Sequence, residues 1–163
     1  FRAFESHLRT FLTESFRLHY LIIAKEPIAW YLSVSKFARK NRWESFQAKS
    51  LNHHLMLDYD RFYLFWLRAS ELSERVRLIR YQDLLETPAQ RLDPIGEEWG
   101  WERISTTWNQ PSEVPMSKKF NAQKLRSYRT KAYRQQLSEL QRWTLAQHLS
   151  RELMEGYGFD LPV

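Results

Sequence analysis

Glycine is missing from residues 1–95 of this chain, and the four glycines that it contains are Gly96, Gly100, Gly156 and Gly158. The phosphate-binding loop G-x-x-x-x-G-K-[ST] and the G-x-G-x-x-G turn of dinucleotide-binding proteins both need glycine where the backbone approaches a phosphate. Neither loop can therefore occur in the first half of the chain. Any phosphate that this protein binds must be held by helix termini and side chains.

The rest of the composition is that of a globular protein. The 163 residues fit one domain, with 43% hydrophobic and 27% charged residues. Cysteine is absent, which excludes disulfides, thiol nucleophiles and cysteine-ligated metals and fits a reducing compartment, so we expect a cytoplasmic protein. No apolar run approaches the roughly 18 residues of a membrane span, so we expect no transmembrane segment. His53 and His54 are adjacent, which on a helix turns them about 100° apart, so we expect structural or surface roles and no metal site.

Apolar spacing predicts an alternation of helices and strands. Helices are expected over 1–17, 27–41 and 44–72 and after Thr87-Pro88, with a long helical region over 120–155, and strands over 19–24 and 75–81. Asp83 is expected to cap the helix that follows the second strand. Alternating strands and helices favour an α/β fold with a parallel sheet. Since two strands seldom make a stable sheet, either further strands exist or the chain is part of a larger α/β domain.

Positive charge is concentrated in the C-terminal third. Residues 118–134 contain seven Lys and Arg and no acidic residue, whereas residues 1–114 are close to neutral. Such a run attracts nucleic acid, an anionic membrane or a phosphorylated small ligand, or it forms a solvated helix face.

The turn between the first strand and the next helix has the features of an anion site. Lys25 ends the strand, Pro27 suits the first position of a helix, and Ser33 lies eight residues after Lys25, about two helical turns on. Free N–H groups and the positive end of the helix dipole favour an anion beside Lys25. The alternative is a plain strand–helix corner with an exposed lysine.

The segment Lys25-Glu26-Pro27-Ile28-Ala29-Trp30-Tyr31-Leu32-Ser33 resembles the 3′-phosphate-binding segment of sulfotransferases that use 3′-phosphoadenosine 5′-phosphosulfate (PAPS). The resemblance implies that Lys25 and Ser33 bind the 3′-phosphate. The segment 80–88 resembles the family's RYEDLL-x-x-P strand end, with Gln82 in place of the usual Glu, and implies that Tyr81 contacts the adenine. Lys118 and Lys119 fall where a late basic loop of the family closes over the 3′-phosphate, and residues 152–159 resemble its closing helix and tail.

The resemblance, which covers roughly residues 19–160, implies the helix-rich part of a P-loop-type sulfotransferase fold with a parallel sheet. It implies a sulfotransferase that moves a sulfonate from PAPS to a hydroxyl of a glycan or a small metabolite, with no metal and no nucleic-acid partner. The family's glycine-containing 5′-phosphosulfate loop has no counterpart here, so residues 1–163 are expected to form a single domain that lacks an N-terminal part. The catalytic base stays unassigned, since His7 is expected to lie on a helix surface. Arg126, Arg129 and Arg134 are expected to face solvent or an acidic acceptor.

Two further functions stay open. A nucleic-acid-binding module would use the basic run 118–134 with Tyr128 and Tyr133 as stacking rings. A helical interaction protein without catalysis would use the same elements without a nucleotide. Neither the acceptor nor the oligomeric state follows from the sequence.

Overall fold

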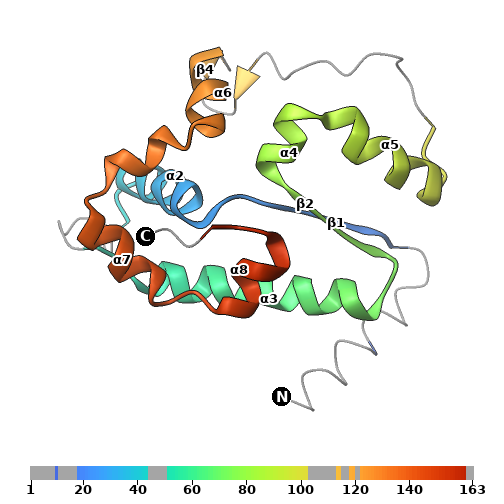
Figure 1. Cartoon of the computed structure of the whole chain (residues 1–163), viewed down its shortest axis with the longest axis horizontal. Helices are drawn as coiled ribbons and strands as arrows, with labels where there is room; N and C mark the ends of the chain where they lie inside the picture. Colours follow the sequence, from blue (N-terminus) through green and yellow to red (C-terminus); the bar gives the residue numbers. More distant parts are fainter. Residues whose placement is uncertain are drawn as a thin grey trace.

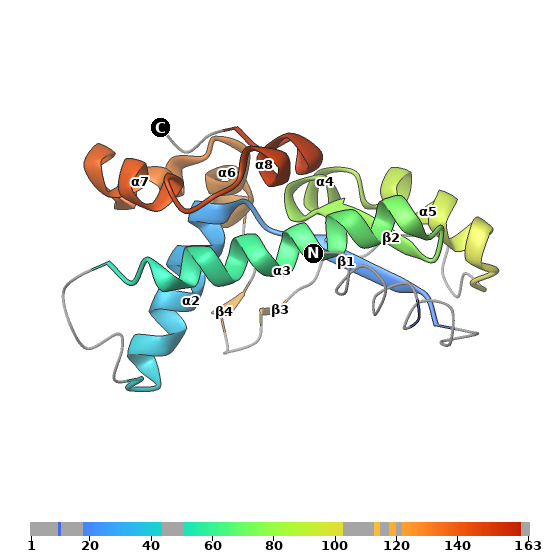
Figure 2. The same ribbon diagram turned by 90° about the horizontal axis from the view of Figure 1, so that it is seen from below.

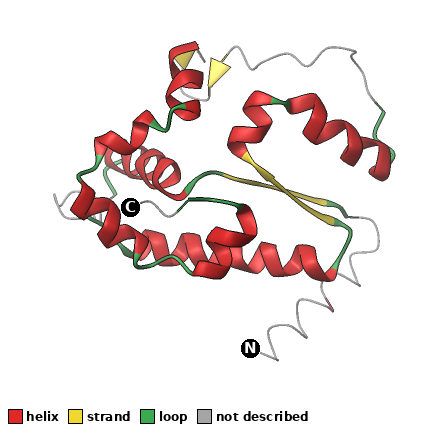
Figure 3. Ribbon diagram, viewed as in Figure 1, coloured by secondary structure: helices red, strands yellow, loops and turns green. Residues whose placement is uncertain are grey.

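The computed structural model describes residues 10, 18–43, 51–102, 113–114, 118–119 and 122–160. Mostly helices and a small parallel sheet make up an α/β structure (Figure 3). In chain order the elements are β1 (Tyr20–Ala24), α2 (Pro27–Lys40), α3 (His54–Leu72), β2 (Val76–Arg80), α4 (Tyr81–Glu86), α5 (Pro88–Trp99), β3 (Glu113–Val114), β4 (Lys118–Lys119), α6 (Ala122–Arg129), the 3₁₀ helix η2 (Ala132–Gln136), α7 (Glu139–Ala146) and α8 (Arg151–Tyr157).

The sheet of β1 and β2 is parallel, as the alternation of elements predicts. Its register places Tyr20 opposite Val76 and Ala24 opposite Arg80. Helices α2 and α3 lie between the two strands in the chain; α3 runs along the strands, with α4 and α5 on the opposite side of them (Figure 1). Among the described residues this sheet has two strands, and β3 and β4 form a separate antiparallel pair.

Helix α2 begins where its sequence predicts. Glu26 caps the helix, because its carboxylate accepts a hydrogen bond from the Ala29 backbone N–H at 2.9 Å, and Pro27 occupies the first helical position. Arg39 and Lys40 stand in the last turn, where the helix dipole favours positive charge.

Two expectations about the helices are wrong, and a third falls almost entirely outside the described residues. Helix α3 begins at His54, and the part of the expected helix within residues 44–50 lies outside the described residues. Asp83 is no cap: α4 starts at Tyr81, and the Asp83 carboxylate instead accepts hydrogen bonds from the Arg80 guanidinium at 2.9 and 2.8 Å. The expected helix over 1–17 lies outside the described residues, apart from the helical Thr10.

The C-terminal helical region is interrupted, and each break has a local cause. Lys131 has a left-handed backbone with a φ of 53°, which separates α6 from η2. Ser138 and Gln141 form a capping box that starts α7, and the Ser150 side chain caps α8. Figure 2 shows α6, α7 and α8 together on one side of the molecule.

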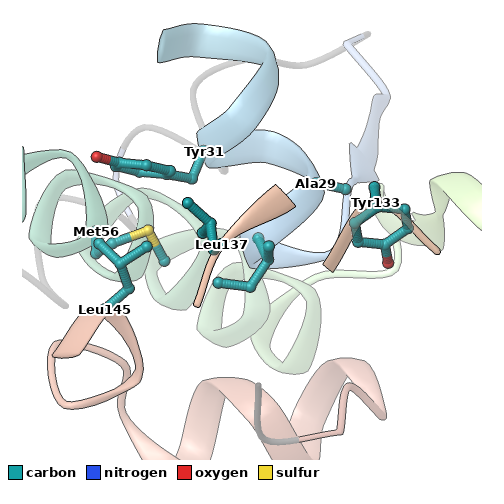
Figure 4. Packing of buried hydrophobic residues seen from close by; sticks show 7 residues of the cluster. Ala29, Tyr31, Met56, Tyr133, Leu137 and Leu145 are labelled. Carbon is teal, nitrogen blue, oxygen red and sulfur yellow. The ribbon is translucent and has the colours of Figure 1, made fainter. Parts of the chain in front are cut away.

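Two groups of buried side chains fix the end of β1. In the first, drawn in Figure 4, side chains from α2, α3 and the C-terminal region pack together; its buried members are Ile28, Ala29, Tyr31, Met56, Tyr133, Leu137 and Leu145. The second joins the sheet to α3 and α8 and comprises Ala24, Tyr59, Tyr63, Leu67, Leu153 and Tyr157. Within the described part of the chain, no helix has both the length and the apolar character that crossing a membrane requires.

Candidate functional site

Lys25 lies directly after the carboxyl end of β1, and side chains of α3 hold its backbone in place. The Tyr59 hydroxyl donates a hydrogen bond to the Lys25 carbonyl at 2.6 Å, and the Tyr63 hydroxyl donates one to the Ile23 carbonyl at 3.4 Å. Tyr59 is 1% exposed and packs edge-to-face against Trp30 of α2. The direction in which the chain leaves the strand and enters α2 is therefore set by buried contacts.

The Lys25 and Ser33 side chains meet across the first turns of α2. The Lys25 ammonium Nζ donates a hydrogen bond to Ser33 Oγ at 2.6 Å, and Ser33 Oγ in turn donates to the Ala29 carbonyl at 2.8 Å. Ser33 is exposed, so the pair lies at the surface, beside the N-terminus of the helix. The structure thus brings together the two residues for which the sequence predicted a shared role.

Tyr81 joins the pair because the two strands are parallel and in register. Ala24 is the partner of Arg80, so the residues that follow them, Lys25 and Tyr81, leave the same edge of the sheet. The Lys25 ammonium lies 5.5 Å from the centroid of the Tyr81 ring. This distance allows a favourable cation–π contact.

Tyr128 of α6 supplies a second ring. Its centroid lies 5.0 Å from the Lys25 ammonium and 5.3 Å from that of Tyr81, with the two ring planes 74° apart. Burial raises the pKa of both tyrosines. The sequence indicates Tyr128 only as a stacking ring for nucleic acid, and no sequence pattern predicts its contact with Lys25.

Burial between these groups lowers the pKa of Lys25 to about 8, and the nearby charge of Glu26 opposes part of that shift. No carboxylate of the described residues forms an ion pair with the Lys25 ammonium. The Glu26 carboxylate is engaged elsewhere, by the Ala29 N–H and by the Arg134 guanidinium at 2.8 Å. The ammonium is therefore partly desolvated and only partly compensated by Glu26, and a bound anion would supply the ion-pair contact that the described carboxylates do not make.

Arg134 was expected to face solvent or an acidic acceptor, but in the structure it does neither. Its guanidinium pairs with Glu26, whose side chain is 2% exposed, and only 18% of the Arg134 side chain is exposed. The two residues are 108 positions apart in the sequence, so no local pattern indicates the pair. Around it, three buried polar atoms lack hydrogen-bond partners among the described residues; they are Arg134 Nε, Tyr133 Oη and Gln82 Oε1.

A hollow of about 150 Å³ adjoins Glu26 and Tyr128. Its walls include three ion-paired cations, in the pairs Asp83–Arg80, Glu86–Arg129 and Asp160–Lys131. Glu26 also lines the hollow, and its cation partner is Arg134. The Arg80 guanidinium also donates to the Gly158 carbonyl at 3.0 Å, which ties the end of α8 to the strand end. We call this region the paired hollow.

Lys118 and Lys119 form β4, which two residues separate from α6, but their side chains lie outside the described residues. The structure therefore does not place either ammonium relative to Lys25. His7 also lies outside the described residues.

His53 and His54 lie in a small group of imidazoles with His148. The ring centroids of His53 and His54 are 4.4 Å apart, and His53 stacks on His148 at 5.0 Å. Among the described residues, no set of three His, Asp or Glu side chains has an arrangement that could hold a metal ion.

Comparison of the chain with protein-family models, with curated proteins and with solved structures found no match. The functional interpretation therefore rests on the geometry around Lys25.

Proposed function

We propose that this protein is a PAPS-dependent sulfotransferase with the helix-rich part of a P-loop-type sulfotransferase fold. The observation that carries the proposal is the hydrogen bond between Lys25 and Ser33 beside the N-terminus of α2. These are the two residues to which the sequence resemblance gives the 3′-phosphate, and nothing else in the sequence requires their side chains to meet.

The described residues fit the 3′-phosphate end of PAPS. Lys25 would supply the positive charge, and Ser33 a hydroxyl once its proton turns from the Ala29 carbonyl to the phosphate. The partly compensated ammonium of Lys25 supports this role, since a phosphate dianion would restore its charge balance. Tyr81 lies beside Lys25, which suits the adenine contact that the resemblance gives it.

When bound, PAPS would supply the sulfonate for an in-line displacement by a hydroxyl of a glycan or a small metabolite. This chain's part in that reaction is to bind and orient the nucleotide at the fixed corner between β1 and α2. We assign no catalytic base among the described residues. Lys118 and Lys119 remain proposed contacts of the 3′-phosphate.

The nucleic-acid alternative has less support from the geometry. Arg129, Lys131 and Arg134, three cations of the basic run, are each paired with a carboxylate. Tyr133 is 6% exposed, and Tyr128 packs against Tyr81, so neither ring stands free to stack on successive bases.

Calorimetric titration with 3′,5′-ADP, the nucleotide product of sulfonate transfer from PAPS, tests the proposal. We expect Lys25→Met and Ser33→Ala each to weaken binding by about tenfold or more, since each removes a hydrogen bond to a charged group. Lys36→Met is the matched control, because Lys36 is an exposed lysine of the same helix. Unchanged affinity in the Lys25→Met, Ser33→Ala double variant, or no binding by the unmodified chain, would overturn the proposal and favour a non-catalytic interaction protein.

A further inference from the structure

The C-terminal end of α2 carries exposed rings and exposed cations side by side. Phe37 is 43% exposed and Trp43 is 45% exposed, and their ring centroids lie 5.7 Å apart with the ring planes at 82°. Between them in the sequence, Arg39, Lys40 and Arg42 are exposed as well. We call these five residues the terminal patch. Large exposed rings that touch each other mark a contact surface more often than isolated ones do.

The terminal patch belongs to a part of the chain with positive charge alone. Residues 27–43 contain four Lys and Arg and no acidic residue. The cations of the paired hollow, by contrast, each have a carboxylate partner. The patch therefore combines apolar surface with the charge of a surface that attracts anions.

Arg42 stands at a position that glycine usually occupies. Its φ is 57°, in the left-handed region, and its N–H donates to the Arg39 carbonyl at 3.1 Å. The Trp43 N–H donates to the Ala38 carbonyl at 3.0 Å, which completes a Schellman helix end. Glycine is favoured there because a side chain strains the left-handed backbone. The chain thus keeps a cation in the patch at a cost in stability, which points to a role for that cation outside the fold.

The terminal patch is remote from the corner at Lys25. Helix α2 has 14 residues, so its two ends are about 20 Å apart. Figure 2 shows the C-terminal end of α2 projecting from the rest of the described structure. A broad surface can therefore reach the patch without approaching the corner.

We propose that the terminal patch attaches this protein, weakly and reversibly, to the surface of a membrane that contains anionic lipids. The three cations lie among the lipid phosphates and carboxylates. The rings of Phe37 and Trp43 enter the region between the headgroups and the acyl chains, where tryptophan is enriched in membrane proteins. Attachment of this kind needs no helix that spans the bilayer.

The rings favour a bilayer over single-stranded nucleic acid. The edge of one ring packs on the face of the other, so they form one apolar projection and not two open faces for successive bases. Size argues against a protein partner, because a stable protein interface takes roughly 20–30 residues from each side. A membrane can be bound by a few residues, since each cation near the surface and each buried apolar group adds to the attraction.

Co-sedimentation of the full chain with lipid vesicles is the first test. We expect binding to vesicles of three parts phosphatidylcholine to one part phosphatidylserine, and binding at least about tenfold weaker to phosphatidylcholine alone. No binding to the mixed vesicles, or equal binding to both kinds, would overturn the proposal.

The variant Arg42→Gly separates membrane binding from folding. It removes one cation of the patch and relieves the strained backbone. We therefore expect about fivefold weaker binding to the mixed vesicles, with unfolding at the same or a higher urea concentration. Lys131→Gly is the matched control, because Lys131 is also a cation with a left-handed backbone, at a φ of 53°, and lies outside the patch. Unchanged binding by Arg42→Gly, or equal weakening by both variants, would refute the role of the patch.

Phe37→Ala tests whether the rings enter the bilayer, since it keeps every charge of the patch. We expect binding to the mixed vesicles to weaken by about fivefold. Phe62→Ala, which removes a ring of α3 that is 54% exposed, should leave binding unchanged. Equal binding by Phe37→Ala and the unmodified chain would contradict the proposal.

A single-stranded oligonucleotide tests the alternative partner. We expect it not to compete with the mixed vesicles for the protein. Oligonucleotide binding that Arg42→Gly and Phe37→Ala both weaken, without binding to vesicles, would assign the patch to nucleic acid and overturn the proposal. These outcomes do not involve 3′,5′-ADP, so they test the patch separately from sulfonate transfer.

Discussion

The corner between β1 and α2, where Lys25 lies, and the paired hollow beside it both contain charged side chains. They differ in whether the positive side chains form ion pairs. Three cations of the hollow, Arg80, Arg129 and Lys131, each have a carboxylate partner, and Arg134 pairs with Glu26 of its wall. At the corner, Lys25 has two rings and a hydroxyl, and no carboxylate among the described residues. The difference shows that the number of cations in a segment does not predict an anion site. A cation that forms no ion pair within the protein is the better candidate to bind an anion.

Most of the ion pairs at the hollow join distant parts of the chain. Glu26 follows β1, Glu86 lies in α4 and Asp160 follows α8, while their partners come from residues 129–134; only the Arg80–Asp83 pair is local. Folding therefore neutralises part of the basic run that is conspicuous in the sequence. This leaves the less conspicuous Lys25 as the cation most available to a ligand at this edge of the sheet.

The largest expected effect comes from breaking the buried pair of the hollow. Arg134→Met leaves the Glu26 carboxylate, 2% exposed, without its cation. We expect the free energy of unfolding to fall by about 3–5 kcal/mol, measured by urea denaturation, because an unpaired buried charge is costly. Arg126→Met, at an exposed position of α6, is the control and should change it little.

The double variant Glu26→Gln, Arg134→Met sharpens this comparison. Removing both charges should recover part of the loss, since no ionised group is then left buried alone. A double variant that is less stable by the sum of the two single losses would show that the two residues are not coupled.

The pH dependence of stability tests the corner. The pKa of Lys25 is lowered to about 8 in the folded chain and returns to near 10.5 when the chain unfolds, so above pH 8 the unfolded state binds more protons. Stability from this group should therefore rise with pH, by about 1–2 kcal/mol between pH 8 and 9.5, a window that ends below the ordinary pKa of tyrosine. Below pH 8 both states are protonated, and this slope vanishes.

Unfolding of the unmodified chain and of Lys25→Met at several pH values in this window provides the measurement. The variant should lack the rise, and it should be at least as stable as the unmodified chain at pH 7, because it buries no charge. The same rise in both proteins would contradict the environment that we describe for Lys25.

Tyr59 offers a smaller test of how the corner is fixed. Tyr59→Phe removes the hydroxyl that donates to the Lys25 carbonyl at 2.6 Å, while its ring can still pack against Trp30. We expect a loss of about 1 kcal/mol in the free energy of unfolding, the usual net contribution of one hydrogen bond. Weaker 3′,5′-ADP binding should accompany it, since the position of Lys25 depends on that contact. Unchanged stability would mean that packing alone fixes the strand end.

The parts of this arrangement that are local in sequence could be predicted, and the distant ones could not. Lys25 lies just before α2 and Ser33 eight residues on within it, so their spacing predicted a shared role, whereas Tyr81 was expected only from the family resemblance. Tyr128 and Arg134 reach the corner only through tertiary packing of the C-terminal region. Their pattern in the sequence is that of an ordinary basic helix.

The wrong boundaries have a similar origin. Asp83 has the residue type of a helix cap, but the neighbouring Arg80 takes its carboxylate in a two-point ion pair, and α4 begins at Tyr81. The break at Lys131 needs a left-handed backbone in a residue that does not favour it, and composition gives no sign of that. By contrast, the Ser138 and Gln141 capping box could have been found from its spacing.

The smallest expected effect on the free energy of unfolding comes from an exposed ion pair at the hollow, Arg129 with Glu86. The Arg129 and Glu86 side chains are 53% and 43% exposed, and their charged atoms lie 3.7 Å apart. Arg129→Met should therefore change the free energy of unfolding by less than about 0.5 kcal/mol, because solvent screens such a pair. It should also leave 3′,5′-ADP affinity unchanged, in contrast to Lys25→Met. If Arg129→Met weakened 3′,5′-ADP binding as much as Lys25→Met does, a cation paired with a carboxylate would bind the nucleotide as well as Lys25, which has no such partner. That result would refute the claim that the corner binds the nucleotide and the hollow does not.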